Sequence, residues 1–103
     1  MNNRLELQAK FEEILGSHNV YFQPPASVLM QYPAIRYELK DFQNRSANNS
    51  SAYISSTGYE CVLIMKEPAD ETLLQSIFQI PHCKFGRYYR ADNLHHYTFT
   101  IYQ

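Results

Sequence analysis

Apolar positions along this chain repeat with two spacings, one typical of helices and the other of strands. In residues 4–15 they fall at i, i+4, i+7 and i+8, which places them on one side of a helix. These positions are Leu7, Phe11, Ile14 and Leu15. Gly16 predicts the end of this helix, because glycine readily takes the left-handed conformation of a C-cap. A second stripe predicts a helix that begins after an N-cap at Asp70. Its members are Leu73, Leu74, Ile77 and Phe78.

Alternation of apolar and polar residues predicts strands in much of the remaining chain. Residues 20–22 form a short candidate, and residues 34–42 alternate cleanly, with one apolar and one wet face. Residues 59–66 are apolar on both faces, which predicts a central strand with a helix on one side and another layer or subunit on the other. Residues 84–90 and 95–102 predict two last strands joined by a short turn.

Residues 43–58 interrupt this pattern with eight Ser or Asn in sixteen positions. Such a composition is typical of a flexible loop or a long hairpin arm, and both alternatives stay open. A long polar segment in a small domain is often functional. Arg45 and Tyr53 are therefore candidate protein-interface residues within it.

The elements together predict one α+β domain that covers residues 1–103. Their order is α-β-β-β-α-β-β. Short turns between neighbouring strands favour a mostly antiparallel sheet with two helices packed on one face.

Charge and apolar runs exclude several classes of protein. Nine Lys and Arg stand against ten Asp and Glu, which lacks the basic excess typical of a nucleic-acid binder. No apolar run is long enough to predict a membrane span, and we expect no membrane partner. The first residues lack the apolar core of a secretory signal, so we expect folding in a cytoplasm with two free thiols.

Candidate chemistry is sparse. His82 and Cys83 are adjacent, as are His95 and His96, and neighbouring strand residues point to opposite faces. Neither pair is therefore expected to grip one metal ion. Cys61 falls in a core strand, where a thiolate is disfavoured. Three scattered glycines give no phosphate loop. We expect no catalytic residue, no metal and no cofactor, and thus a protein that is not an enzyme.

Tyrosine is the unusual component. Nine Tyr and six Phe are too many for the core of a small domain, so we expect some at the surface, where Tyr favours protein interfaces. Residues 87–90 interleave two Arg with two Tyr, as single-strand binders do. A small nucleic-acid-binding module is accordingly the alternative to a protein-binding subunit, and an unrecognised small enzyme is a third class.

The simplest pairing of the last two strands predicts two groups of residues. One face would carry Tyr88, Arg90, His96 and Tyr102, and the other would carry Phe85, Arg87 and Tyr89. These residues, apart from Phe85, are candidate protein-interface positions. Asp92, Asn93 and His96 have a simpler interpretation as stabilisers of the hairpin turn.

Two segments carry a pattern that resembles the tail terminator, or tail-completion, proteins from the neck of long-tailed bacteriophages. Residues 19–39 read NVYFQPPASVLMQYPAIRYEL, and residues 80–102 read IPHCKFGRYYRADNLHHYTFTIY. With the first helix, the resemblance covers nearly the whole chain. The matching positions of the second segment are Ile80, Pro81, Phe85, Arg87, Tyr89, Asp92, Asn93, Leu94, His96, Phe99 and Tyr102. The Ser- and Asn-rich segment and the stretch CVLIMKEPADE depart from the family pattern.

The resemblance implies a ring, usually a homohexamer, that caps the tail tube and then accepts the filled head. Its implied partners are further copies of the chain, the tail tube protein and a head-completion or connector protein. DNA would pass through the lumen without sequence-specific contacts. The implied location is the virion, at the junction of neck and tail, after assembly in the host cytoplasm. Residues 43–58 would form the arm that faces a partner or the lumen.

Overall fold

The computed structural model describes residues 3–46 and 52–103, with side chains described in 4–43 and 56–103. Two helices and five strands follow one another in the order α-β-β-β-α-β-β, which confirms the predicted α+β fold. The elements are α1 (Asn3–Leu15), β1 (Val20–Phe22), β2 (Ala34–Ser46), β3 (Ala52–Met65), α2 (Glu71–Phe78), β4 (Cys83–Ala91) and β5 (Leu94–Tyr102).

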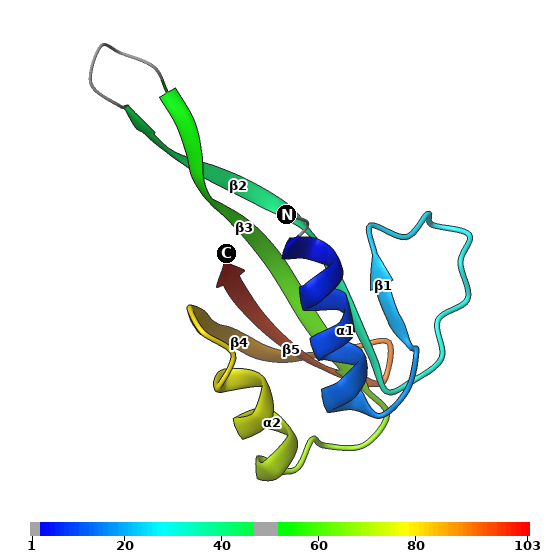
Figure 1. The fold of residues 1–103 in the computed structure, drawn as a ribbon. Coiled ribbons are helices and arrows are strands. Elements are labelled where there is room, and N and C mark those ends of the chain that lie inside the picture. The colour runs from blue at the N-terminus through cyan, green and yellow to red at the C-terminus, as the bar shows by residue number, and fades with distance from the viewer. Residues whose placement is uncertain (1–2, 47–51) are drawn as a thin grey trace.

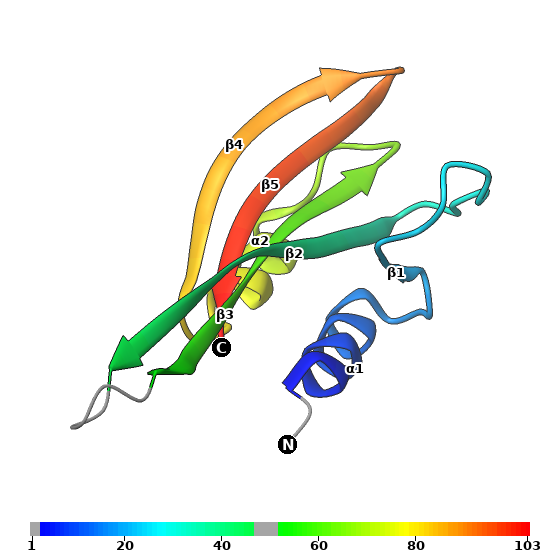
Figure 2. The same cartoon turned by 90° about the horizontal axis from the view of Figure 1, so that it is seen from above.

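The strands form one sheet in the order β1-β2-β3-β5-β4. The short β1 pairs with β2 in parallel, and the other neighbours are antiparallel. Residues 59–66 lie mostly in β3, and β3 is the middle strand of the five, so the central position predicted for them is confirmed. Both helices cover the same side of the twisted sheet, which we call the helix face, and the other side is the open face (Figures 1 and 2).

The core fills the space between the helices and the helix face. The ring of Phe11 meets the rings of Tyr37 and Phe99 edge to face, with centroids 5.4 and 6.0 Å apart. Ile77 contributes from α2. The predicted stripes are confirmed except at Phe78, which is exposed because it ends α2 over the sheet edge, where it packs on Phe85. None of the helices among the described residues is long and apolar enough to cross a membrane.

Both predicted helix ends are present. Gly16 has a φ of 74°, and its N–H donates to the Glu12 carbonyl at 2.9 Å. The Asp70 carboxylate accepts a hydrogen bond of 2.8 Å from the Leu73 N–H, as an N-cap does. These local signals are readable in the sequence because they depend on neighbouring residues alone.

Of the two alternatives for residues 43–58, residues 43–46 and 52–58 take the hairpin form, and residues 47–51 lie outside the described residues. Strands β2 and β3 remain paired from Ala34 and Ile64 to Ser46 and Ala52, with two register shifts on the way. The outer part of this hairpin extends past the helices and past the end of β5 (Figure 1). We call residues 40–46 and 52–57 the arm.

Candidate protein-interaction surfaces

The described residues bring no metal-binding group together: no three His, Cys, Asp or Glu side chains converge. Burial raises the pKa of the Cys61 thiol far above its usual range, and it raises the pKa of Cys83 to about 11. Both thiols therefore stay protonated near neutral pH, where the thiolate is the reactive form. This chemistry gives no reason to place a nucleophile at either cysteine.

The predicted grouping of residues on β4 is wrong, because a bulge interrupts the strand. Phe85 lies opposite Phe99, but Tyr88 lies opposite Tyr97. Between these two pairs β4 therefore has two residues and β5 has one. Thr98 faces the bulge: its hydroxyl accepts from the Arg87 N–H at 2.8 Å. Beyond the bulge the side chains change faces. Tyr88 thus joins Phe85 on the helix face instead of joining His96.

Gly86 makes this bulge possible. A β-carbon on Gly86 would lie only 2.5 Å from the Thr98 hydroxyl oxygen and 3.2 Å from the Thr98 carbonyl oxygen. The close approach of β5 leaves no room for a side chain there. A glycine within a strand pattern is a known sign of a bulge, and it was the signal in the sequence that could have corrected the face assignment.

Tyr89 is the centre of an aromatic and basic cluster on the open face. Its ring stacks on His96 across the strands, with centroids 4.7 Å apart and planes 11° apart. The guanidinium of Arg87 lies over the same ring, 4.6 Å from its centroid. The structure therefore brings together three of the predicted interface residues, Arg87, Tyr89 and His96.

Tyr88 and Arg90 take the other face of β4. The Tyr88 ring lies 5.0 Å from that of Tyr97, and its hydroxyl shares a 2.7 Å hydrogen bond with His95 Nδ1. Arg90 is opposite His95 and exposed. The sole ion pair among the described residues joins Glu12 to His18, so the basic side chains of β4 enter none.

Tyr102 lies apart from that cluster, at the base of the arm. Its hydroxyl donates to an Asp41 carboxylate oxygen at 3.2 Å, and the Lys40 ammonium lies 5.9 Å from its ring centroid. Gly58 lies opposite both Asp41 and Tyr102. Tyr102 thus braces β2 against β5 across Gly58 of β3, where the arm begins.

Arg45 and Tyr53 pair with each other across the arm. Their side chains fall outside the described residues, so their predicted contacts stay predictions.

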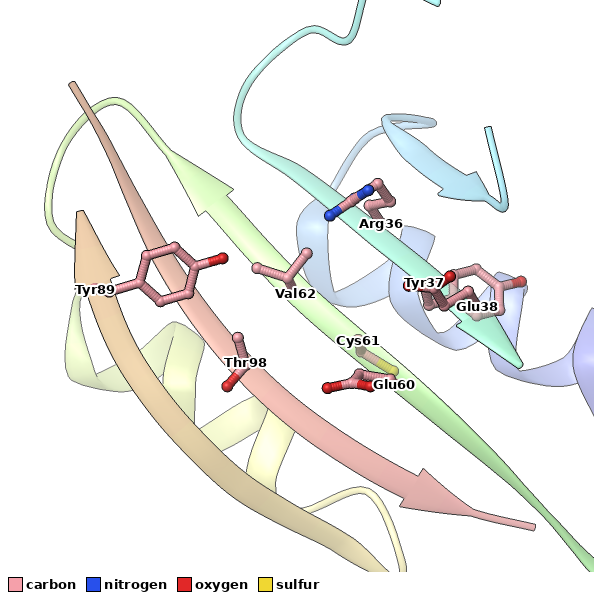
Figure 3. Close-up of a pocket in the computed structure, with 8 residues that line it drawn as sticks. All are labelled: Arg36, Tyr37, Glu38, Glu60, Cys61, Val62, Tyr89 and Thr98. Atoms are coloured by element: carbon pink, nitrogen blue, oxygen red, sulfur yellow. The ribbon is translucent and has the colours of Figure 1, made fainter. Parts of the chain in front are cut away.

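A shallow hollow of about 120 Å³ lies in the middle of the open face (Figure 3). Val62 is in its floor and only 7% exposed, although no helix covers this face. Figure 3 shows the Tyr89 hydroxyl directed across the face toward Val62. On the far side Glu38 lies directly opposite Glu60, a like-charge pair that costs some stability in a sheet. The hollow is shallow and open to solvent, so a protein surface could also contact its lining.

A second surface follows the β4 edge on the helix face. It consists of Phe78, Phe85 and Tyr88, and all three are exposed. The rings of Phe78 and Phe85 meet at 5.6 Å, and Phe85 and Tyr88 are successive helix-face residues because of the bulge. We call this group the β4-edge patch. Large aromatic side chains exposed together are typical of a protein contact.

A third surface lies at the arm base on the helix face, where the sheet runs beyond the cover of the helices. Leu39 and Phe42 of β2 are exposed there. We call these residues the arm-base patch. It lies on β2, toward one edge of the sheet, whereas the β4-edge patch lies along the opposite edge of the same face. One molecule therefore carries two different apolar surfaces.

No protein-family model matches this chain, and a search of the curated proteins found no match to it either. The assignment of function therefore rests on the surfaces of the molecule and on the sequence resemblance.

Proposed function

We propose that this chain is a structural subunit of a bacteriophage neck, forming a ring that caps the tail tube and offers the surface that joins the head. The observation that carries the proposal is that different apolar surfaces lie toward the two opposite edges of one sheet, the β4-edge patch at one edge and the arm-base patch toward the other. A ring closed by rotation joins two different surfaces of each copy, whereas a two-fold dimer joins one surface to itself. The β4-edge patch and the surfaces toward the opposite edge, on the β1 and β2 side of the strand order, meet this requirement.

The residues behind the resemblance divide into two groups. Asp92 and Asn93 have positive φ angles of 55° and 62° and form the turn between β4 and β5, while Phe99 is in the core. These positions shape the fold. Arg87 and Tyr89 instead lie on the open face. This second group supports a role in contacts, because the Arg87 side chain is exposed on the open face beside the Tyr89 ring.

The arm supplies the proposed contact with a tail tube protein or a head-completion protein. It extends beyond the helices, and its base is braced by Tyr102 (Figure 1). A rigid base lowers the entropy cost of docking the outer residues. Removal of residues 45–56 should leave the domain folded and impair docking or ring closure. Intact tail assembly with that deletion would contradict the role of the arm.

Electron microscopy tests the proposal directly. The purified protein should form rings alone at high concentration or when mixed with tail tubes, and the rings should sit at the tube end. Sedimentation would show the matching oligomer. A protein that stays monomeric at every concentration and never binds tail tubes would refute the proposal.

The nucleic-acid alternative has less support. Residues 87–90 alternate between the two faces of β4, so their two Tyr do not form one platform for stacked bases. The Tyr89 ring already contacts both His96 and Arg87. The alternative predicts binding to single-stranded DNA that weakens steeply as salt rises. A shift in fluorescence anisotropy of a labelled oligonucleotide at low salt, removed by Arg87→Ala, would favour it over the ring.

A further inference from the structure

The connection between β1 and β2, residues 23–33, lies along the outer edge of the sheet. Because β1 and β2 are parallel, the chain must travel back past β1 before it can begin β2. Figures 1 and 2 both show this connection projecting away from the sheet beyond β1. A neighbouring molecule that approaches this edge therefore meets residues 23–33 before it meets β1.

The middle of this connection carries two exposed apolar side chains. Leu29 is 90% exposed, the highest value among the large exposed hydrophobic side chains of the described residues, and Val28 beside it is also exposed. Residues 23–33 contain no Lys, Arg, Asp or Glu. An isolated exposed leucine is ordinary in a protein, but this leucine belongs to a projecting, uncharged segment, so it can reach an apolar surface on a neighbouring molecule.

Hydrogen bonds hold both ends of the connection in place. At its start, the Gln23 N–H donates to the Tyr37 carbonyl at 2.9 Å, and its side-chain oxygen accepts from the Leu39 N–H at 3.1 Å. At its end, the Gln31 N–H donates to the Tyr21 hydroxyl at 3.1 Å. A segment that is fixed before binding loses less conformational entropy when it docks.

We propose that Leu29 of one copy docks on the β4-edge patch of a second copy. The inference rests on the proposed ring and names the contact that closes it. The strand order places the connection outside β1 at one edge and the patch on β4 at the other, so every copy offers both halves. In a ring, the opposite edges of successive copies face each other.

The chemistry of the two surfaces agrees. Phe85 is 44% exposed and its ring meets that of Phe78 at 5.6 Å, while Tyr88 is the next helix-face residue of β4, so the patch offers exposed aromatic surface to an aliphatic side chain. The β4 edge also carries the exposed charges of Lys84 and Arg90. Because the docking segment is uncharged, it brings no like charge to this basic edge and no charge of its own to desolvate.

One such contact is small compared with the roughly 1,600 Å² of a stable protein interface, so an isolated pair of copies should be weak. In a closed ring each copy makes the contact twice, and the last contact is intramolecular, which strengthens the whole assembly. Association should therefore rise steeply with protein concentration, or occur once a tail tube collects the copies.

Thiol cross-linking tests the contact. The double variant Leu29→Cys/Tyr88→Cys, treated with a short bis-maleimide at high concentration and again with tail tubes, should give a ladder of covalent oligomers. Each single variant should give almost none, because Leu29 does not meet Leu29 in a head-to-tail contact. Glu13→Cys/Tyr88→Cys is the matched control and should give no ladder, because Glu13 is exposed on α1 outside the proposed contact surfaces. Cys61 and Cys83 are poor targets at neutral pH because their pKa values are raised.

Sedimentation supplies the second measurement. Leu29→Ala should raise the concentration needed for assembly roughly 10- to 50-fold, because the leucine side chain loses most of its buried area. Ser27→Ala in the same segment should leave it unchanged. Rings seen by electron microscopy together with no ladder and no effect of Leu29→Ala would overturn this contact and leave the proposed function standing. No ring and no ladder, alone or on tubes, would overturn both.

Discussion

Gly58 should be intolerant of a methyl group that its own backbone would accept. A β-carbon at Gly58 would lie 2.7 Å from Tyr102 Cε1 and would also collide with the Asp41 carboxylate. Gly58→Ala must therefore displace both side chains. The displacement breaks the 3.2 Å hydrogen bond between them and lifts the Tyr102 ring off the sheet.

The expected cost follows from these losses. A surface hydrogen bond contributes about 1 kcal/mol, and re-exposure of roughly 40 Å² of ring adds about 1 kcal/mol. Alanine regains about 0.5–1 kcal/mol, since glycine within a strand is destabilising. Gly58→Ala should therefore lower the free energy of unfolding by about 1–1.5 kcal/mol.

The sign should reverse when the obstruction is removed. In an Asp41→Ala/Tyr102→Ala background the methyl group meets open space, so Gly58→Ala should raise the free energy of unfolding by about 0.5–1 kcal/mol. Urea unfolding of the four proteins, followed by circular dichroism, completes the cycle. An equal effect of Gly58→Ala in both backgrounds would show that Tyr102 does not brace the arm base.

Three other effects follow from the structure. Phe11→Ala should cost about 3–5 kcal/mol in urea unfolding, because Phe11 is fully buried against two rings. Asp70→Ala should cost about 1 kcal/mol through the lost N-cap, and Asp70→Asn should restore most of it. Cys83 should react with iodoacetamide slowly at pH 8 and faster toward a pKa of about 11. The thiol of the unfolded chain has its ordinary pKa of 9.0, so it ionises before the folded one. The free energy of unfolding should therefore fall between about pH 9 and pH 11, and it should fall by less in the Cys83→Ala variant. Rapid labelling of Cys83 at pH 7, or the same pH dependence of stability in Cys83→Ala, would contradict the raised pKa. An unchanged free energy of unfolding in Phe11→Ala or Asp70→Ala would contradict the role given to that residue.

The helices and strands could be predicted from the sequence because their signals are local and repeated. The Leu7 and Phe11 stripe, the Asp70 cap and the alternation in residues 34–42 each involve residues within a few positions of one another. The central place of β3 was also visible, since Val62 and Ile64 make its second face apolar. Each of these features depends on spacing, which the sequence displays directly.

The composition of the surfaces is harder to predict, because it depends on register, and Gly86 signals a bulge without giving the partners of the residues that follow it. One extra residue in β4 moves Tyr88 from the face of His96 to the face of Phe85. A shift of one residue exchanges the two faces of a strand, so every later side chain is assigned wrongly. The parallel pairing of β1 was equally hidden, because it depends on contacts between segments that are distant in the chain.

The tyrosines link the fold to the proposed contacts. Three of the tyrosines are buried in the core, namely Tyr37, Tyr59 and Tyr97. Of the rest, Tyr21 holds the Leu29 connection and Tyr102 braces the arm, each through its hydroxyl. A phenylalanine would supply the ring at either site and lose the bond. Tyrosine at these positions therefore stiffens the connection and the arm base, which under the proposed function would lower the conformational entropy lost when copies dock.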